Sequence, residues 1–110
     1  MYEQKEIVLM PFPYTDLTSY KNRPALIISN KLLNKTEDRI CLLITSVPTK
    51  DGIEIDKRSI KEGRLPLKSW VKPYRIFTIN EKIIKKKLCV VSDDFYDLVL
   101  KEVNKYLKKK

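Results

Sequence analysis

The interpretation of the chain starts from one stretch, Asn22-Arg23-Pro24-Ala25-Leu26-Ile27-Ile28-Ser29. A short apolar run between polar segments predicts a strand that is buried on both faces. Pro24 donates no backbone hydrogen bond, so we expect it at the first position of this strand or on a sheet edge. Pro24 also favours an extended conformation at Arg23. Arg23 therefore either presents a cation to a ligand from a rigid scaffold or covers a sheet edge with charge.

Similar short apolar runs along the chain predict further strands. With the first stretch included, they occupy residues 7–10, 24–29, 39–46, 53–55, 69–71, 75–79 and 88–91. We expect Pro11 to end the first strand and residues 72–73 to separate the strands at 69–71 and 75–79. Short helical turns are expected at residues 31–33 and 82–84. Residues 56–68 are weakly patterned and predict a loop with short pieces of structure.

The last element is predicted to be an amphipathic helix. Ser92 is a favourable N-cap, and Asp93 and Asp94 complement the positive end of the helix dipole. Between residues 95 and 107, apolar side chains recur at helical spacing. Short strands followed by one terminal helix predict a mainly β (α+β) fold, in which the helix packs on a small, strongly bent sheet or barrel.

The size and composition predict one domain without a membrane segment. The 110 residues fit a single domain, residues 1–110. No run approaches the roughly 20 apolar residues of a membrane span, and the polar start does not resemble a signal peptide. We therefore expect a cytoplasmic protein. Cys41 and Cys89 lie in apolar runs and are expected to be buried thiols, with a disulfide between them as the alternative.

The charge of the chain is unevenly distributed. Residues 1–55 hold seven basic and seven acidic residues, whereas residues 56–110 hold sixteen and seven, which supplies the whole net charge of +9. This asymmetry suggests a polyanionic or acidic protein partner. A lysine-rich solvated surface is the alternative interpretation, above all for the runs at residues 85–87 and 108–110.

The chain contains no histidine. It therefore lacks the commonest general acid–base residue and the commonest ligand of transition metals. Two distant cysteines do not make a zinc site by themselves, and two glycines allow no glycine-rich phosphate loop. We expect no metal and no cofactor, and chemistry that relies on Arg, Lys, hydroxyl groups, Tyr or carboxylates.

Three blocks of the sequence resemble the PemK/MazF toxins of toxin–antitoxin modules. They are residues 12–29 (FPYTDLTSYKNRPALIIS), the apolar strand that ends in Ile44-Thr45-Ser46, and residues 69–80 (SWVKPYRIFTIN). With the terminal helix, the resemblance runs from about Glu6 to Leu107. It implies an SH3-like barrel of the PemK/MazF/CcdB type, usually a homodimer.

The resemblance also implies an activity, partners and site residues. The family's activity is sequence-selective cleavage of single-stranded RNA without a metal, and an acidic, partly disordered antitoxin neutralises it. Arg23 matches the catalytic arginine before the proline, and Thr45 matches the catalytic threonine at the end of the third strand. Lys72 falls where the PemK branch usually has a second active-site arginine.

Other side chains near these positions are expected to bind RNA. Aromatic rings stack on unpaired bases, so Tyr14 and Tyr20 are candidate platforms, with core or dimer contacts as the alternative. Lys21, Ser46 and Arg75 complete the set of expected RNA-binding residues.

The proton acceptor for the reaction is open. Tyr74 stands where the PemK branch often carries an aspartate, and Lys5-Glu6 replaces the common Gly-Asp before the first strand. An arginine scarcely deprotonates, so Asp16, Glu6 and Tyr74 are the candidate bases, beside an activated hydroxyl at Thr45 or Ser46. Asp16 also suits a turn.

Two other functions fit the same kind of barrel. One is a basic barrel that binds RNA or DNA without cutting it, and the other is a growth inhibitor that binds a protein target such as a gyrase. The combination of Arg23 with Thr45 favours the nuclease, because a pure binding module does not need that pair.

Overall fold

The computed structural model describes residues 1–13 and 20–110. The described strands are β1 (Glu6–Pro13), β2 (Tyr20–Ile27), β3 (Asp38–Thr45), β4 (Ile53–Ile55), β5 (Ile60–Gly63), β6 (Ser69–Asn80) and β7 (Lys86–Val91). The helices are α1 (Lys31–Asn34) and α2 (Asp93–Leu107), and two 3₁₀ turns cover Lys57–Ser59 and Glu81–Ile83.

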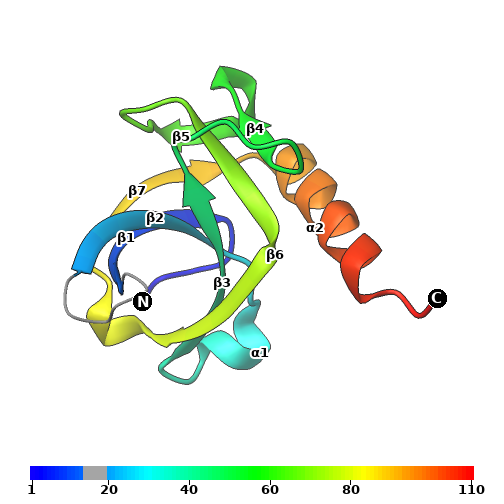
Figure 1. Cartoon of the computed structure of the whole chain (residues 1–110). Coiled ribbons are helices and arrows are strands. Elements are labelled where there is room, and N and C mark those ends of the chain that lie inside the picture. The colour runs from blue at the N-terminus through cyan, green and yellow to red at the C-terminus, as the bar shows by residue number, and fades with distance from the viewer. Residues whose placement is uncertain (14–19) are drawn as a thin grey trace.

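The strands form one antiparallel sheet in the order β4-β6-β3-β2-β1-β7-β5. This sheet curls into a nearly closed barrel, and α2 packs on its outside against β6 (Figure 1). The Ser92 hydroxyl caps α2 by accepting a hydrogen bond from Phe95 N at 3.2 Å. The predicted mainly β fold with a C-terminal helix is confirmed.

The central strands are buried on both faces, as their unbroken apolar sequence predicts. Ala25, Leu26 and Ile27 are each fully buried. Leu26 belongs to a core that α2 covers, whereas Ala25 and Ile27 belong to a second core on the opposite face of the sheet. The register of β2 in the sheet is therefore well defined, because a slip by one residue would move each of these side chains from one core to the other.

The prediction that Pro11 ends the first strand is wrong, since β1 continues to Pro13. Lys85 N donates to Leu9 O at 2.7 Å, so the backbone groups of Leu9 face β7. Backbone groups alternate along a strand, so Pro11 and Pro13 face the same side. Pairing of β7 with β1 stops at Leu9. Neither proline therefore interrupts a ladder, and both pair in register with β2.

The predicted break at residues 72–73 is also absent, because β6 is a single strand of 12 residues. Its pairing with β3 shifts between Leu42, which faces Ile76, and Ile44, which faces Val71. The four residues 72–75 of β6 thus lie opposite Leu43 alone. A bulge of this kind bends a strand without ending it, and it accommodates the buried Pro73.

Segment 56–68, predicted as a loop with short pieces, contains one 3₁₀ turn and strand β5. Asp56 caps this turn by accepting from Arg58 N and Ser59 N at 2.9 and 3.1 Å. The cysteines are free, as the sequence predicts, and both are buried. Burial raises the pKa of Cys41 to about 12 and that of Cys89 to about 11, so both thiols are protonated at neutral pH.

Candidate active site

The candidate site is a cleft of about 270 Å³ at the place where β2 separates from β3. Ile28 N donates to Ile40 O at 2.9 Å, so by alternation the backbone of Pro24 also faces β3. The β2–β3 ladder ends at the pair Ala25–Leu43, one residue short of Pro24. Because Pro24 has no N–H to donate, the strands part there, and both Pro24 and Ile44 line the resulting cleft.

The cleft combines an apolar floor with cationic and hydroxyl groups at its sides. Its lining residues are Leu9, Lys21, Asn22, Arg23, Pro24, Ile44, Ser46, Leu65, Pro66, Leu67, Ser69, Lys86 and Leu88. Leu65 and Leu88 also pack against the core under α2, so the floor continues that core. No carboxylate is present among these described lining residues. Such a lining suits a ligand with a flat apolar part and negative charge, as in a nucleotide.

Three of the residues predicted from the sequence line the cleft. They are Arg23, Lys21 and Ser46, which come from β2 and from the end of β3. Arg23 is half-buried, while Lys21 and Ser46 are exposed. Pro24 lies within β2, which starts at Tyr20, so Arg23 stands inside a paired strand opposite Met10 instead of in a loop.

Thr45 lies between two cleft residues, Ile44 and Ser46, but is itself buried. Its Oγ1 accepts a hydrogen bond from Val47 N at 3.1 Å. This bond fixes the turn after β3, which carries Ser46 at the cleft.

The remaining predicted side chains in the described part of the chain do not line the cleft. Lys72 and Arg75 lie in the bulge of β6, half-buried and exposed respectively. Tyr74 lies in the same bulge, with its ring centroid 5.6 Å from that of Tyr106 on α2.

Glu6 begins β1 and is 8% exposed, and its Oε1 has no hydrogen-bond partner among the described residues. Burial raises the pKa of this carboxyl, while a hydrogen bond from the Glu3 backbone and the charge of Lys87 act in the opposite direction. Glu6 is absent from the cleft lining.

Two predicted residues, Tyr14 and Asp16, lie outside the described residues. Tyr20 starts β2 and pairs with Pro13, and its side chain is likewise outside the description.

Sequence reasoning missed several cleft residues. Lys86 belongs to a lysine run that gives no hint of a site, and the apolar runs that contain Leu9 and Ile44 indicate ordinary buried strands. Leu65, Pro66 and Leu67 come from the link between β5 and β6, and Ser69 Oγ holds that link by donating to Leu67 O at 2.8 Å. Only the order of strands in the sheet brings these segments together.

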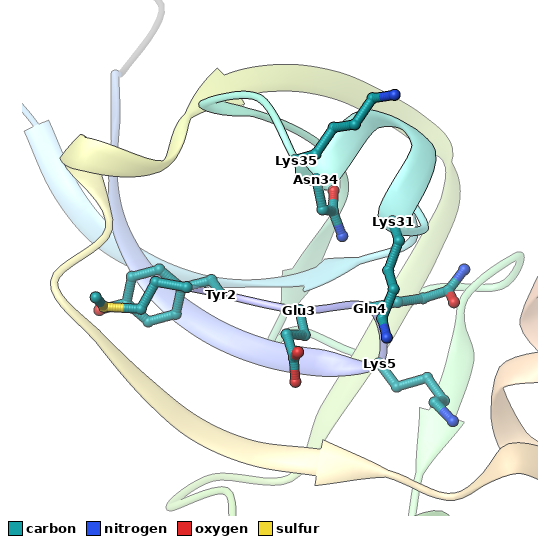
Figure 2. A pocket seen from close by; sticks show the side chains of 8 residues that line it. Tyr2, Glu3, Gln4, Lys5, Lys31, Asn34 and Lys35 are labelled. Atoms are coloured by element: carbon teal, nitrogen blue, oxygen red, sulfur yellow. The ribbon is translucent and has the colours of Figure 1, made fainter.

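A larger hollow of about 480 Å³ lies on another part of the surface, between the N-terminal segment and α1 (Figure 2). It contains none of the predicted catalytic or RNA-binding residues. Its amide side chains serve the fold: Asn34 Nδ2 donates to Ser29 O at 2.6 Å, and Gln4 Nε2 donates to Ile28 O at 3.0 Å. We therefore assign this hollow to the anchoring of the N-terminal segment.

Neither a metal cluster nor a membrane helix is found in residues 1–13 and 20–110. In this part of the chain no group of three or more Cys, Asp or Glu side chains converges as a metal site would require. None of its helices is long and apolar enough to cross a membrane.

The barrel with its C-terminal helix has the MazF-like fold. In a MazE–MazF structure from Deinococcus radiodurans, one chain matches over 99% of this chain and 97% of its own length, with a TM-score of 0.79 and 15% identity. An endoribonuclease from Mycobacterial species, solved with its cognate antitoxin, matches over 99% and 95%, with a TM-score of 0.76 and 16% identity.

The family itself follows from the sequence. Residues 3–107 match the model of the PemK-like, MazF-like toxins of type II toxin–antitoxin systems. The chain therefore belongs to this toxin family, as the three sequence blocks predict. No curated protein sequence matches it.

Proposed function

We propose that the protein is an endoribonuclease toxin that cuts single-stranded RNA without a metal, by attack of a ribose 2′-hydroxyl on the adjacent phosphate. The observation that carries this proposal is the cleft, in which Arg23, Lys21 and Ser46 surround an apolar floor. The Mycobacterial relative described as an endoribonuclease shares the fold, and the family match supports a toxin.

Arg23 is the residue proposed to stabilise the transition state. As the 2′-oxygen bonds to phosphorus and the bond to the 5′-oxygen breaks, negative charge grows on the phosphoryl oxygens and on the leaving oxygen. A guanidinium remains charged at every relevant pH and donates two parallel hydrogen bonds to such oxygens. A fixed donor of this kind is usually the largest catalytic contribution.

Thr45 and Ser46 are proposed to support this step. The Thr45 hydroxyl uses one acceptor site for Val47 N, and it retains an O–H group that can donate to a phosphoryl oxygen or hold the arginine. Ser46 is exposed at the cleft and offers a second hydroxyl.

We propose Asp16 as the proton acceptor, with an activated hydroxyl at Thr45 or Ser46 as the alternative. Glu6 and Tyr74 do not line the cleft, and Tyr74 packs on Tyr106. Asp16 lies four residues before Tyr20, the first residue of β2, the strand that carries Arg23. We expect Asp16→Asn to slow cleavage while RNA binding persists.

The test is incubation of the purified protein with a long RNA, followed by mapping and chemical analysis of the new ends. We expect cleavage in the presence of EDTA, with 2′,3′-cyclic phosphate and 5′-hydroxyl ends. A 2′-deoxy group at the scissile nucleotide should block cleavage and leave binding intact. Loss of cleavage in EDTA, or 5′-phosphate ends, would contradict the mechanism.

Arg23 variants test the assignment of the main catalytic group. Arg23→Ala should slow cleavage by roughly 100-fold or more, as expected for the loss of one transition-state donor. Arg23→Lys should restore only part of the rate, because an ammonium does not form the bidentate contact. RNA that is bound but never cut by the wild-type protein would instead favour a non-catalytic nucleic-acid-binding barrel.

A further inference from the structure

Lys86 differs from its neighbours in the lysine run 85–87. Lys86 lines the cleft, and Lys85 and Lys87 do not. Lys87 Nζ lies 3.6 Å from a Glu62 carboxylate oxygen on β5, whereas no ion pair of Lys86 is found among the described residues. Within the run, Lys86 therefore lies at the cleft, Lys87 is paired with β5, and Lys85 is exposed on the surface.

The strand register places Lys86 on the far side of the cleft from β2. Lys86 of β7 faces Leu9 of β1, and Leu9 in turn faces Pro24 of β2. Residues directly opposite one another in an antiparallel sheet share a face, so these three residues form a row across the cleft floor. Neighbouring strands are about 4.8 Å apart, which separates the backbones of Lys86 and Pro24 by roughly 10 Å.

The surface between the two cations is apolar. Leu9 and Pro24 form the row itself, and Leu65 and Leu88 continue the floor. Arg23 precedes Pro24 in β2, so by strand alternation its side chain leaves the strand on the face opposite this row, at the end of the row away from Lys86. Because Arg23 and Lys86 leave their strands at opposite ends of this row and on opposite faces, they suit two different phosphates of one bound strand, such as the two that flank one nucleoside.

We propose that Lys86 binds the phosphodiester next to the one that is cut, so that the cleft holds a single nucleoside between Arg23 and Lys86. This inference rests on the proposed ribonuclease function and adds to it a second phosphate subsite on β7. Lys86 is a binding residue: it forms an ion pair with a non-bridging phosphate oxygen and takes no part in bond making. It supplies, from β7, the second cation that the sequence suggested at Lys72 on β6.

The first test compares the salt dependence of RNA binding among variants. The probe is a short single-stranded RNA with a 2′-deoxy group at its cleavage site, so that it binds without being cut. Lys86→Ala should weaken binding about tenfold and reduce the slope of log K against log salt by about 0.7, the value for one phosphate contact in a single strand. Lys85→Ala is the matched control, because it removes the same charge one residue away and outside the cleft lining.

The second test locates the phosphate. A set of probes, each with one neutral methylphosphonate linkage, is titrated with the wild-type protein and with Lys86→Ala. At one linkage adjacent to the scissile one, the neutral group should weaken binding to the wild type but leave binding to Lys86→Ala unchanged. The subsite is overturned if Lys86→Ala weakens binding no more than Lys85→Ala does. It is also overturned if Lys86→Ala lowers the affinity equally for every probe, wherever the neutral linkage stands.

These outcomes separate the subsite from the ribonuclease itself. A wild-type protein that cuts no RNA contradicts the proposed function, whatever Lys86 does. A wild-type protein that cuts RNA, combined with Lys86→Ala and Lys85→Ala variants that bind alike, contradicts only the subsite. Lys86 is exposed, so we expect Lys86→Ala and Lys85→Ala to melt at the same temperature as the wild type. This comparison checks that the fold of both variants is intact.

Discussion

At the scale of single residues, the clearest departure from ordinary packing is Glu6. It is nearly buried at the start of β1, and one carboxylate oxygen has no partner among the described residues. Burial raises the pKa of the carboxyl above its usual range, against the opposing effects of a hydrogen bond from the Glu3 backbone and of the charge of Lys87. Burial of a carboxylate costs stability, and the neighbouring carboxylate of Glu3 adds to the penalty, whereas a hydrogen bond from the Glu3 backbone reduces it.

This environment predicts a pH-dependent effect of Glu6→Gln. Below the unfolded-state pKa of about 4.3, Glu6 is neutral in both the folded and the unfolded chain. As the pH rises from there through the raised pKa of the folded state, the unfolded chain ionises more readily and wild-type stability falls. Glu6→Gln lacks this loss, so its melting temperature should exceed that of the wild type by more at pH 7 than at pH 4.

The measurement is thermal unfolding of both proteins across this pH range. A Glu6→Gln variant that is less stable than the wild type at pH 7 would show that the Glu3 backbone and Lys87 stabilise the carboxylate by more than its burial costs. RNA cleavage by the same variant should be retained, because Glu6 lies outside the cleft lining. Loss of cleavage in a folded Glu6→Gln protein would return Glu6 to the list of proton acceptors.

Another residue, Arg39, shows what sequence reasoning at this scale does not reveal. It opens an apolar strand in the sequence and would be expected at the surface, yet its side chain is fully buried. Nε donates to Tyr2 O at 2.8 Å, and Nη2 lies 3.1 Å from Oε1 of Glu81. The partners come from positions far apart in the chain, so no local pattern indicates this anchor of the N-terminal segment.

At the scale of elements, the predicted strands were correct wherever an apolar run was long. The errors occurred at prolines, and they share one cause. A proline ends a ladder only if its missing N–H points to a paired neighbour, and the sequence does not show which neighbour that is. On β1, the backbones of Pro11 and Pro13 face the side where pairing with β7 has already ended at Leu9. On β6, a bulge accommodates Pro73.

The bulge in β6 also determines what is expected of Lys72. The family resemblance places a second active-site cation here, but Lys72 is half-buried in the bulge and does not line the cleft. We predict that Lys72→Ala lowers RNA affinity and the salt slope, by less than Lys86→Ala does, through contacts with RNA outside the cleft. Lys72→Arg should preserve both quantities.

Titration with the uncleavable RNA probe at several salt concentrations measures this difference. Unchanged affinity and slope in Lys72→Ala would remove Lys72 from the RNA-binding surface. A slope change larger than that of Lys86→Ala would place the second phosphate at β6 instead of β7.

At the scale of the whole molecule, the candidate site depends on strand order more than on any motif. Arg23, Lys21 and Ser46 were accessible to sequence reasoning because they lie in β2 or directly after β3, the two most recognisable strands. Lys86 reaches the same cleft only because β7 pairs with β1, and Leu65 reaches it from the link between β5 and β6. Pairings between segments so distant in sequence follow from the closure of the barrel, which local patterns do not specify.

The outer surface of the molecule leads to the final prediction, that the protein is a homodimer. Several large apolar side chains are exposed on β6 and α2: Tyr74, Ile76, Leu98, Tyr106 and Leu107. Exposed apolar clusters in a small protein commonly mark an interface, and the family resemblance also implies a dimer.

Light scattering at roughly 50 μM, where an interface of standard size remains associated, should give about twice the chain mass of 13.0 kDa. Leu107→Asp should shift the mass towards the monomer if α2 contributes to the interface, whereas Lys110→Asp, at the exposed end of the chain, should leave it unchanged. A wild-type protein that is monomeric at this concentration contradicts the prediction.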